Sequence, residues 1–442
     1  MQPAPVLCCP NVVVTVHRRQ GLSGPTTIGN LIDEQLSADM REFLHTAGES
    51  AASEGFRLFL VGGMVRDLLL NRPSRDLDLL VQSANPSMND APALASMLAM
   101  DLGGKVASVS QFGTANLRVS GFETDLATAR KETYAFSGAL PDVIPATIEE
   151  DLTRRDFTVN TLAADLAPIA FGALLDLHRG VDDLQQGMLR VLHDRSFQDD
   201  PTRLLRAARY ETRLGLRMTP ETEAAARRDA EHLKQVSGDR IWHELERIFD
   251  EDQPEIALAR ADNLVLFQTL VPTLEWAPEL SRAVQSIREA GHVTTPLLYL
   301  ALLSIPLTKG NSEALVARLR VPAPWAEVIR DMHTLRVRLP SLGVDNMLPS
   351  AVYARLSGLT TECILGWSAL APEQATRGLL LSFLMKWQLV KPHLTGDDLL
   401  KLGVHQGPKI GELLQELLNA RLDDVVVTRG DEEALVKERL AG

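Results

Sequence analysis

Two aspartates, Asp76 and Asp78, stand two residues apart in a run of strand-forming residues that ends at Val81. Alternate residues of a strand point to the same face, so both carboxylates are expected on one side, with Cα atoms roughly 6–7 Å apart. Two carboxylates at that spacing can bridge a pair of divalent cations about 3.5–4 Å apart, as in enzymes of in-line phosphoryl displacement. The pair therefore predicts metal-dependent chemistry at phosphorus.

The stretch ahead of this pair is suited to hold phosphate groups. Phe56–Val61 is an expected strand that stops at Gly62-Gly63, where the backbone can turn sharply and approach a ligand closely. Met64–Leu70 is an expected short helix with Arg66 in its first turn, where free backbone N–H groups favour an anion. A Gly-Gly pair alone is usually a turn, and an Asp-x-Asp pair alone is usually a solvated strand edge. Their ordered combination is far more specific.

This combination closely resembles the signature of the nucleotidyltransferase superfamily, in the form seen in class II tRNA CCA-adding enzymes and the related bacterial poly(A) polymerases. The resemblance implies that Asp76 and Asp78 bind two Mg²⁺ ions. It also implies that Gly62, Gly63 and Arg66 bind the triphosphate of an incoming nucleotide.

A third carboxylate is expected beside the pair. Strands are expected near residues 105–109, 114–120 and 123–129, and Asp125 lies on the last of them. The superfamily often carries a third carboxylate on such a strand, so Asp125 is a candidate metal-site residue or catalytic base, with an edge-strand charge as the alternative. Residues 130–150 hold two prolines and a glycine and are expected to form a long loop, which the resemblance identifies with the flexible loop of the family.

Residues 149–164 are expected to form a helix that contains two adjacent arginines. The sequence from Arg154 to Ala163 resembles a second element of the family, and this resemblance implies that Arg155 binds the nucleotide. A guanidinium group can clamp phosphate oxygens through paired hydrogen bonds. Asp156 and Asn160 stand four apart, on one face of the expected helix, and are candidates to fix the ribose or an arginine. Arg154 is expected to face solvent.

The segment from Asp199 to Tyr210 is the second decisive stretch. Asp199 or Asp200 is expected to cap a helix. Cytosine and adenine both present an amino donor beside a ring-nitrogen acceptor, whereas uracil and guanine present the opposite order. A carboxylate at Asp200 and a guanidinium at Arg203, three apart on one helix, could therefore select C and A. A basic helix face paired with acids is the alternative.

The same stretch matches the family's protein template for the incoming base. By this resemblance Arg206, and also Arg209, contact the nucleotide.

The elements that must position these residues form an α+β protein, expected as a small mixed β-sheet head followed by an all-helical neck, body and tail. With 442 residues the chain is too long for one core. The expected divisions are a lead-in (1–29), the catalytic head (30–187), a neck that contacts the base and RNA (188–250), a helical body (251–340) and a tRNA-binding tail (341–442).

Composition limits the kind of RNA site and the cellular compartment that are expected for the protein. The net charge of −13 argues against broad adhesion to nucleic acid, so an RNA site must be a local surface. Cys8, Cys9 and Cys363 form no disulfide framework or metal spacing, which favours the cytoplasm. No stretch reaches the ~18 apolar residues of a membrane span. No obligate protein partner is implied.

The leading hypothesis is Mg²⁺-dependent, template-independent addition of C, C and A to tRNA 3′ ends from CTP and ATP. A CC-adding enzyme, an A-adding enzyme and a poly(A) polymerase are alternatives within the class. A non-catalytic RNA-binding protein with the same fold is the alternative from another class.

Overall fold

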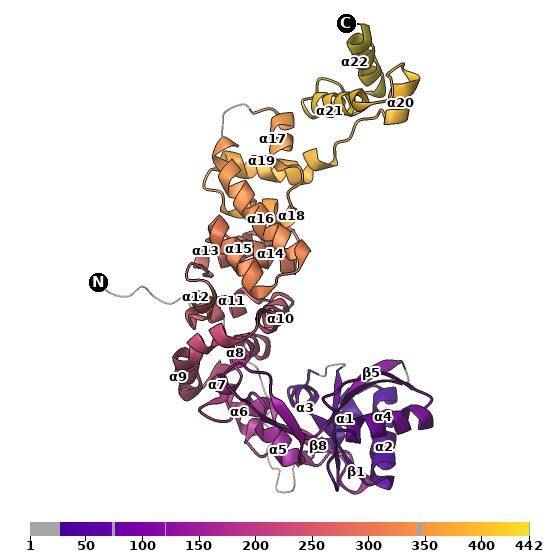
Figure 1. Cartoon of the computed structure of the whole chain (residues 1–442), viewed down its shortest axis with the longest axis vertical. Helices are drawn as coiled ribbons and strands as arrows, with labels where there is room; N and C mark the ends of the chain where they lie inside the picture. The colour runs from indigo at the N-terminus through magenta and orange to yellow at the C-terminus, as the bar shows by residue number, and fades with distance from the viewer. Residues whose placement is uncertain (1–26, 73–75, 120, 343–346, 442) are drawn as a thin grey trace, which may run out of the picture. The chain divides into compact units, whose positions relative to one another are not determined.

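The computed structural model describes residues 27–72, 76–119, 121–342 and 347–441. Contacts divide the chain into two compact units, Met1–Ser237 and Gly238–Gly442, and each unit is described by itself (Figure 1). Most of the expected lead-in lies outside the described residues. The expected boundaries between head, neck, body and tail remain predictions.

A seven-stranded mixed sheet forms the centre of the first unit. The strands follow the order β3-β4-β5-β2-β1-β8-β9; β5 and β2 run parallel and the other neighbours antiparallel. They are β1 (Phe56–Val61), β2 (Leu77–Ser83), β3 (Lys105–Val109), β4 (Thr114–Val119), β5 (Phe122–Thr128), β8 (Ala163–Asp165) and β9 (Leu174–Leu175). The mixed sheet confirms the predicted α+β class.

Helices cover the two faces of this sheet unequally. The described helices of the unit are α1 (Gly29–Gln35), α2 (Ala38–Ser53), α3 (Gly63–Leu69), α4 (Asp90–Asp101), α5 (Ile148–Thr153), α6 (Gly180–Gln186), α7 (Ser196–Asp199), α8 (Thr202–Leu214) and α9 (Pro220–Asp229). Helix α4 packs on β2, β3, β4 and β5, and α2 packs on β1, so Leu77, Leu79 and Val81 of β2 are buried. Helix α5 packs on the opposite face over β1, β2 and β8 through Phe59, Leu80 and Leu152. The part of that face on β5 and β4 carries exposed residues.

Two helix predictions need correction. The expected helix over 149–164 ends at Thr153 and is followed by one 3₁₀ turn (Thr158–Asn160) and strand β8. The β-branched residues Thr158, Val159 and Thr161 disfavour helix, and all three are buried in the irregular segment. The apolar spacing of residues 28–52 predicts one amphipathic helix, but the structure has two helices there, because Ser37 caps the start of α2 by accepting from the Met40 N–H.

The predicted long loop over residues 130–150 contains a β-hairpin. Strands β6 (Arg130–Thr133) and β7 (Asp142–Pro145) pair antiparallel, with Arg130 opposite Pro145. The glycine and the prolines lie in the connection or at the strand end, so these residues bound the strands without interrupting them. A further small sheet joins β10 (Met188–Leu189) and β11 (Arg217–Met218) in parallel.

The second unit is helical throughout its described residues. Its helices are α10 (Gly238–Phe249), α11 (Pro254–Asn263), α12 (Leu266–Leu270), α13 (Pro278–Glu289), α14 (Pro296–Leu303), α15 (Lys309–Leu319), α16 (Ala323–Arg338), α17 (Pro349–Leu356), α18 (Thr361–Leu370), α19 (Gln374–Met385), α20 (Gly396–Lys401), α21 (Pro408–Leu422) and α22 (Arg429–Ala441). Leu399, Leu413, Leu417 and Val436 pack together in a small cluster near the C-terminus. None of the described helices in either unit combines the length and the apolar character needed to cross a membrane.

Gly48 allows α2 to pass close to the backbone of Leu166. A Cβ atom at position 48 would lie 2.0 Å from the Leu166 carbonyl oxygen. Gly48→Ala is therefore expected to displace α2 and to lower the free energy of unfolding of the first unit by about 1–3 kcal/mol, which urea or thermal unfolding measures.

Gly378→Ala is the matched control, because a Cβ at this position of α19 would meet nothing within 4 Å. This control is expected to be neutral or stabilising by up to about 1 kcal/mol. Equal effects of the two substitutions would contradict the close contact at Gly48.

Candidate active site

Three carboxylates gather on the open face of the sheet. Asp78 on β2 lies directly opposite Asp125 on the parallel strand β5. Asp76 stands two residues before Asp78, and all three residues are exposed. The Asn116 side-chain amide on β4 donates to Asp125 Oδ1 at 3.0 Å. The structure thus confirms that Asp125 stands on the strand beside the pair.

The electrostatic surroundings of Asp78 favour a cation. Although Asp78 is exposed as a residue, the protein around its carboxyl removes part of the solvent, and this desolvation raises its pKa to about 6. The nearby Arg155 guanidinium lowers this pKa in part, and the Asp125 and Asp76 carboxylates raise it further. Like charges gathered in a partly desolvated place disfavour the ionised form. A divalent cation would offset that repulsion.

The described residues contain no group of three or more His, Cys, Asp or Glu side chains arranged to hold a metal ion. Mg²⁺ in nucleotide sites usually takes one or two carboxylates, with waters and substrate phosphates as its other ligands. Asp76 and Asp78 fit that mode, in which the nucleotide completes the coordination.

The turn at Gly62 brings the backbone against Arg155. Gly62 has φ +64° and ψ −120°, and a Cβ there would lie 2.9 Å from Arg155 Nη1. The Gly62 N–H donates to the Leu162 carbonyl at 2.9 Å. Arg155 therefore lies beside the Gly-Gly turn, and its positive charge also acts on Asp78. Both parts of the sequence signature meet at this guanidinium.

Asp151 fixes the two adjacent arginines. Its side chain is fully buried; Arg155 Nη2 donates to Oδ2 at 3.1 Å, and Arg154 Nη2 donates to Oδ1 at 2.6 Å. Burial alone would raise the pKa of Asp151, but Arg155 and Arg154 hold it below its usual value. Arg154 also donates to Glu132 of β6 at 2.7 Å. The expectation that Arg154 faces solvent is therefore wrong.

A second polar chain runs from α3 to α8. Arg66 is 3% exposed and donates to Asp67 at 2.7 Å and to Asn160 at 2.5 Å. Asn160 donates to Asp156 at 3.0 Å, and Asp156 pairs with Arg206 of α8 at 2.7 Å. Asn160 therefore orients an arginine, which was one of its two expected roles. The phosphate contact of Arg66 remains a prediction.

The start of α8 places the expected base-reading residues. Helix α8 begins at Thr202 with Pro201 as its N-cap and no side-chain cap hydrogen bond, so the predicted cap at Asp199 or Asp200 is wrong. Asp200 lies one residue before that N-cap, and its Oδ1 accepts from the Thr202 N–H at 3.1 Å. Arg203 is buried and donates to Ser196 Oγ at 2.7 Å and to the Arg154 carbonyl at 2.7 Å. Arg209 is also buried, with its guanidinium over the Tyr210 ring. Contacts of Asp200, Arg203, Arg206 and Arg209 with a nucleotide remain predictions.

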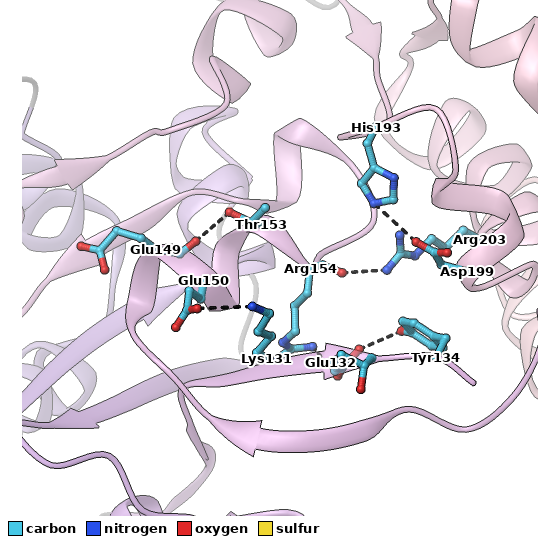
Figure 2. Close-up of a pocket in the computed structure, with 11 residues that line it drawn as sticks. Lys131, Glu132, Tyr134, Glu149, Glu150, Thr153, Arg154, His193, Asp199 and Arg203 are labelled. Atoms are coloured by element: carbon cyan, nitrogen blue, oxygen red, sulfur yellow. Dashed lines mark hydrogen bonds and ion pairs between the residues drawn. The ribbon is translucent and has the colours of Figure 1, made fainter. Parts of the chain in front are cut away.

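A pocket of about 610 Å³ opens on the Arg154 side of this segment (Figure 2). Figure 2 shows the His193 and Tyr134 rings on either side of Arg203 and Asp199. The Tyr134 hydroxyl donates to Glu132, and burial, together with Glu132, raises the pKa of Tyr134. The lining residues are Lys131, Glu132, Thr133, Tyr134, Glu149, Glu150, Thr153, Arg154, His193, Asp199 and Arg203.

Sequence reasoning missed Asp151, Glu132, Tyr134 and His193. Asp151 had a usable signal, because it stands three and four residues before Arg154 and Arg155, the spacing of helical ion pairs. Glu132 lies on β6 and Tyr134 directly follows that strand, but the proline-containing stretch around them concealed the hairpin.

The family comparison agrees with this geometry. Residues 58–190 match the family described as "Poly A polymerase head domain", and residues 215–277 match "Probable RNA and SrmB- binding site of polymerase A". A mixed sheet with carboxylates on its open face, joined to this match, defines the head of a nucleotidyltransferase.

Whole-chain relatives narrow the class. The chain is 31% identical to an A-adding tRNA nucleotidyltransferase of Halalkalibacterium halodurans, over 87% of the chain and 89% of the relative. It is 32% identical to a CC-adding tRNA nucleotidyltransferase of Deinococcus radiodurans, over 94% and 98%. An A-adding relative from Geobacter sulfurreducens is 31% identical, but the match spans only 48% of that longer protein.

Solved structures similar to this chain come from the same class of enzyme as these relatives. A CCA-adding enzyme in an apo form aligns with a TM-score of 0.80 at 29% identity, covering 94% of this chain and 99% of that chain. Thermotoga maritima CCA-adding enzyme complexed with tRNA aligns with a TM-score of 0.77 at 27% identity, over 94% and 99%. The chain belongs to the family of class II tRNA nucleotidyltransferases.

Asp151→Asn is expected to destabilise the first unit by about 3–5 kcal/mol near neutral pH, because it removes the buried charge that two arginines share. The folded-state pKa of Asp151 is lowered, so its stabilising contribution is present above the unfolded-state value of about 4 and is lost as the pH falls below it. The difference in unfolding free energy between wild type and variant should therefore shrink below about pH 4, as urea unfolding measures.

Asp182→Asn is the matched control. Asp182 pairs with Arg179 at 2.8 Å in an exposed position, so its loss should cost less than about 1 kcal/mol. A wild-type-like Asp151→Asn protein would contradict the proposed weight of the buried pair.

Proposed function

We propose that this chain adds C, C and A, or part of that sequence, to the 3′ end of tRNA from CTP and ATP without a nucleic-acid template. The arrangement around Asp78 carries this proposal: Asp125 lies opposite on one neighbouring strand, and the Gly62 turn follows the other. Structures of CCA-adding relatives with CTP, with ATP and with tRNA support the choice of substrates.

Asp76 and Asp78 would hold two Mg²⁺ ions, which supply charge stabilisation to the attacking and leaving oxygens of the displacement. Asp125 stands where it can accept a proton from the 3′-hydroxyl of the RNA or add a ligand oxygen. The Asn116 amide restrains one oxygen of Asp125 and leaves the other for that role.

Gly62, Gly63 and Arg155 would bind the triphosphate. The glycine turn lets backbone N–H groups approach phosphate oxygens, and the Arg155 guanidinium lies at the turn. Arg155 is held from behind by Asp151, so little side-chain entropy would be lost on binding. Arg66 supports the site through Asn160, with direct phosphate contact as its proposed second role.

Asp200 and Arg203 would read the base, with Arg206 and Arg209 nearby on α8. Arg203 donates to the carbonyl of Arg154, the neighbour of Arg155, so the proposed base-reading and phosphate-binding groups are joined through one short segment. That link supports a single site for both ends of the nucleotide.

The extent of addition is open to two narrower candidates. The A-adding and CC-adding relatives each match most of the chain at similar identity, which favours these two partial activities over poly(A) synthesis.

An extension assay decides between these activities. Purified protein is mixed with Mg²⁺, CTP and ATP, and with tRNA that lacks CCA, ends in CC, or ends in CCA. Full addition is expected as two C and one A on the first RNA and one A on the second, read from product size.

Addition of A only to the CC end would identify the A-adding enzyme, and addition that stops after two C would identify the CC-adding enzyme. Long A tails would identify a polymerase. No extension of any RNA would exclude the catalytic proposal and favour the RNA-binding protein.

Asp78→Ala is expected to lower the rate of addition by at least about 100- to 1000-fold, since several kcal/mol of metal-dependent stabilisation would be lost. The affinity for the nucleotide should fall by a smaller factor than the rate of addition. Single-turnover extension and equilibrium CTP binding measure the two effects separately.

Asp39→Ala, an exposed change at the start of α2, serves as the control and should keep full activity. Wild-type activity in Asp78→Ala would exclude the metal assignment.

A further inference from the structure

The open face of the sheet continues beyond the carboxylates as two polar rows. The first row crosses four strands, because Asp78 lies opposite Asp125, Asp125 opposite Asn116, and Asn116 opposite Ser108. Cross-strand neighbours share a face of the sheet, so these four side chains point the same way.

The second row runs parallel to the first, two residues further along the strands. Glu123 of β5 lies opposite Arg118 of β4, and Arg118 lies opposite Lys105 of β3. All three residues are exposed, and Arg118 pairs with Glu123 at 2.6 Å. An exposed pair of this kind contributes little to stability, so Arg118 is available to a ligand at small cost.

A β-bulge aligns the outermost strand with these rows. The register shifts between Val106 and Ser108, which places Lys105 and Ser108 on the same face although they are three residues apart. Bulges often re-aim side chains beside active sites. Without the shift, Lys105 and Ser108 would face opposite sides of the sheet.

The charges on this face change sign from strand to strand: Asp78, Asp125 and Glu123 lie on β2 and β5, whereas Arg118 and Lys105 lie on β4 and β3. From Asp125 to Arg118 the path is one strand across and two residues along, or roughly 8 Å from the usual strand spacing and rise. That is about the length of one nucleotide. A nucleotide with its 3′-hydroxyl at Asp125 could therefore place its own phosphate at Arg118 and Lys105.

We propose that the two polar rows bind the 3′-terminal nucleotide of the RNA that is extended, with Arg118 and Lys105 on its phosphate and Asn116 on its ribose hydroxyls. The inference deepens the proposed function, on which it rests, by giving the RNA end a place of its own.

The strand order supports this assignment. The Gly62 turn follows β1, on one side of β2, whereas the polar rows lie on β5, β4 and β3, on the other side. In-line displacement needs the attacking hydroxyl and the leaving pyrophosphate on opposite sides of the reacting phosphorus. A triphosphate at Gly62 and an RNA end on the polar rows would approach Asp78 from those two sides.

The test is the double variant Arg118→Gln, Lys105→Gln. The KM for tRNA should rise about tenfold, while the KM for CTP and ATP stays within twofold of wild type. The dependence of tRNA binding on salt should become less steep by a log–log slope of about one to two, since two phosphate contacts are lost.

Arg57→Gln is the matched control. Arg57 is a strand arginine of the same sheet in a cross-strand ion pair with Asp165 at 3.1 Å, far along the strands from Asp78. This variant should keep the wild-type KM for tRNA. An unchanged KM for tRNA in the double variant, or an equal rise in the control, would overturn the inference.

A second measurement uses the unaltered protein. A tRNA with 4-thiouridine as its last nucleotide should crosslink to peptides within residues 105–125, as mass spectrometry would show. Crosslinks confined to other segments would overturn the inference. These outcomes separate this inference from the proposed function. A wild-type protein that extends no RNA would contradict the proposed function. An active protein without crosslinks to residues 105–125 would contradict only the binding of the RNA end by the two polar rows.

Discussion

The carboxylate of Asp151 is buried and charged, and its two oxygens pair with two guanidinium groups, those of Arg154 and Arg155. These two arginines contact different parts of the first unit. Arg155 lies against the Gly62 turn, and its charge lowers the pKa of Asp78. Arg154 donates to Glu132 on the β6–β7 hairpin. A lone carboxylate would be costly in this place, and each arginine offsets part of that cost. The sheet face that carries the carboxylates and the pocket are thus connected through a single ionised group, Asp151.

The family signature made the head predictable. Strand β1, the Gly-Gly turn, the short helix and strand β2 follow directly from periodicity and from glycine, and the strand beside the pair carries Asp125 as expected. The errors fell where tertiary contacts outweigh local preference. Residues 154–162 carry a helix-like spacing of polar side chains, yet ion pairs to Asp151 and the burial of Phe157 and Val159 hold them in an irregular path. The hairpin at 130–145 was hidden because its breakers lie at strand ends, a distinction that needs the pairing partner to be known.

The acidic composition is compatible with RNA as the proposed substrate once charge is considered locally. The net charge of −13 would weaken contact with phosphates over most of the surface. Arg118 and Lys105 stand side by side at the far end of the sheet face, and Arg155 stands at the turn, so positive charge is placed at the ends of the proposed reaction path with the carboxylates between. Such an arrangement favours correct placement of substrates over tight, unspecific adhesion.

One contact bears on the proposed base-reading role of Arg203. Besides the Ser196 hydroxyl, Arg203 is held by the main-chain carbonyl of residue 154, which no side-chain replacement at that position removes. A laboratory effort to broaden the choice of nucleotide by substitution at 154 would leave this anchor in place. Insertions or deletions nearby, which shift the peptide itself, are the changes that would release it.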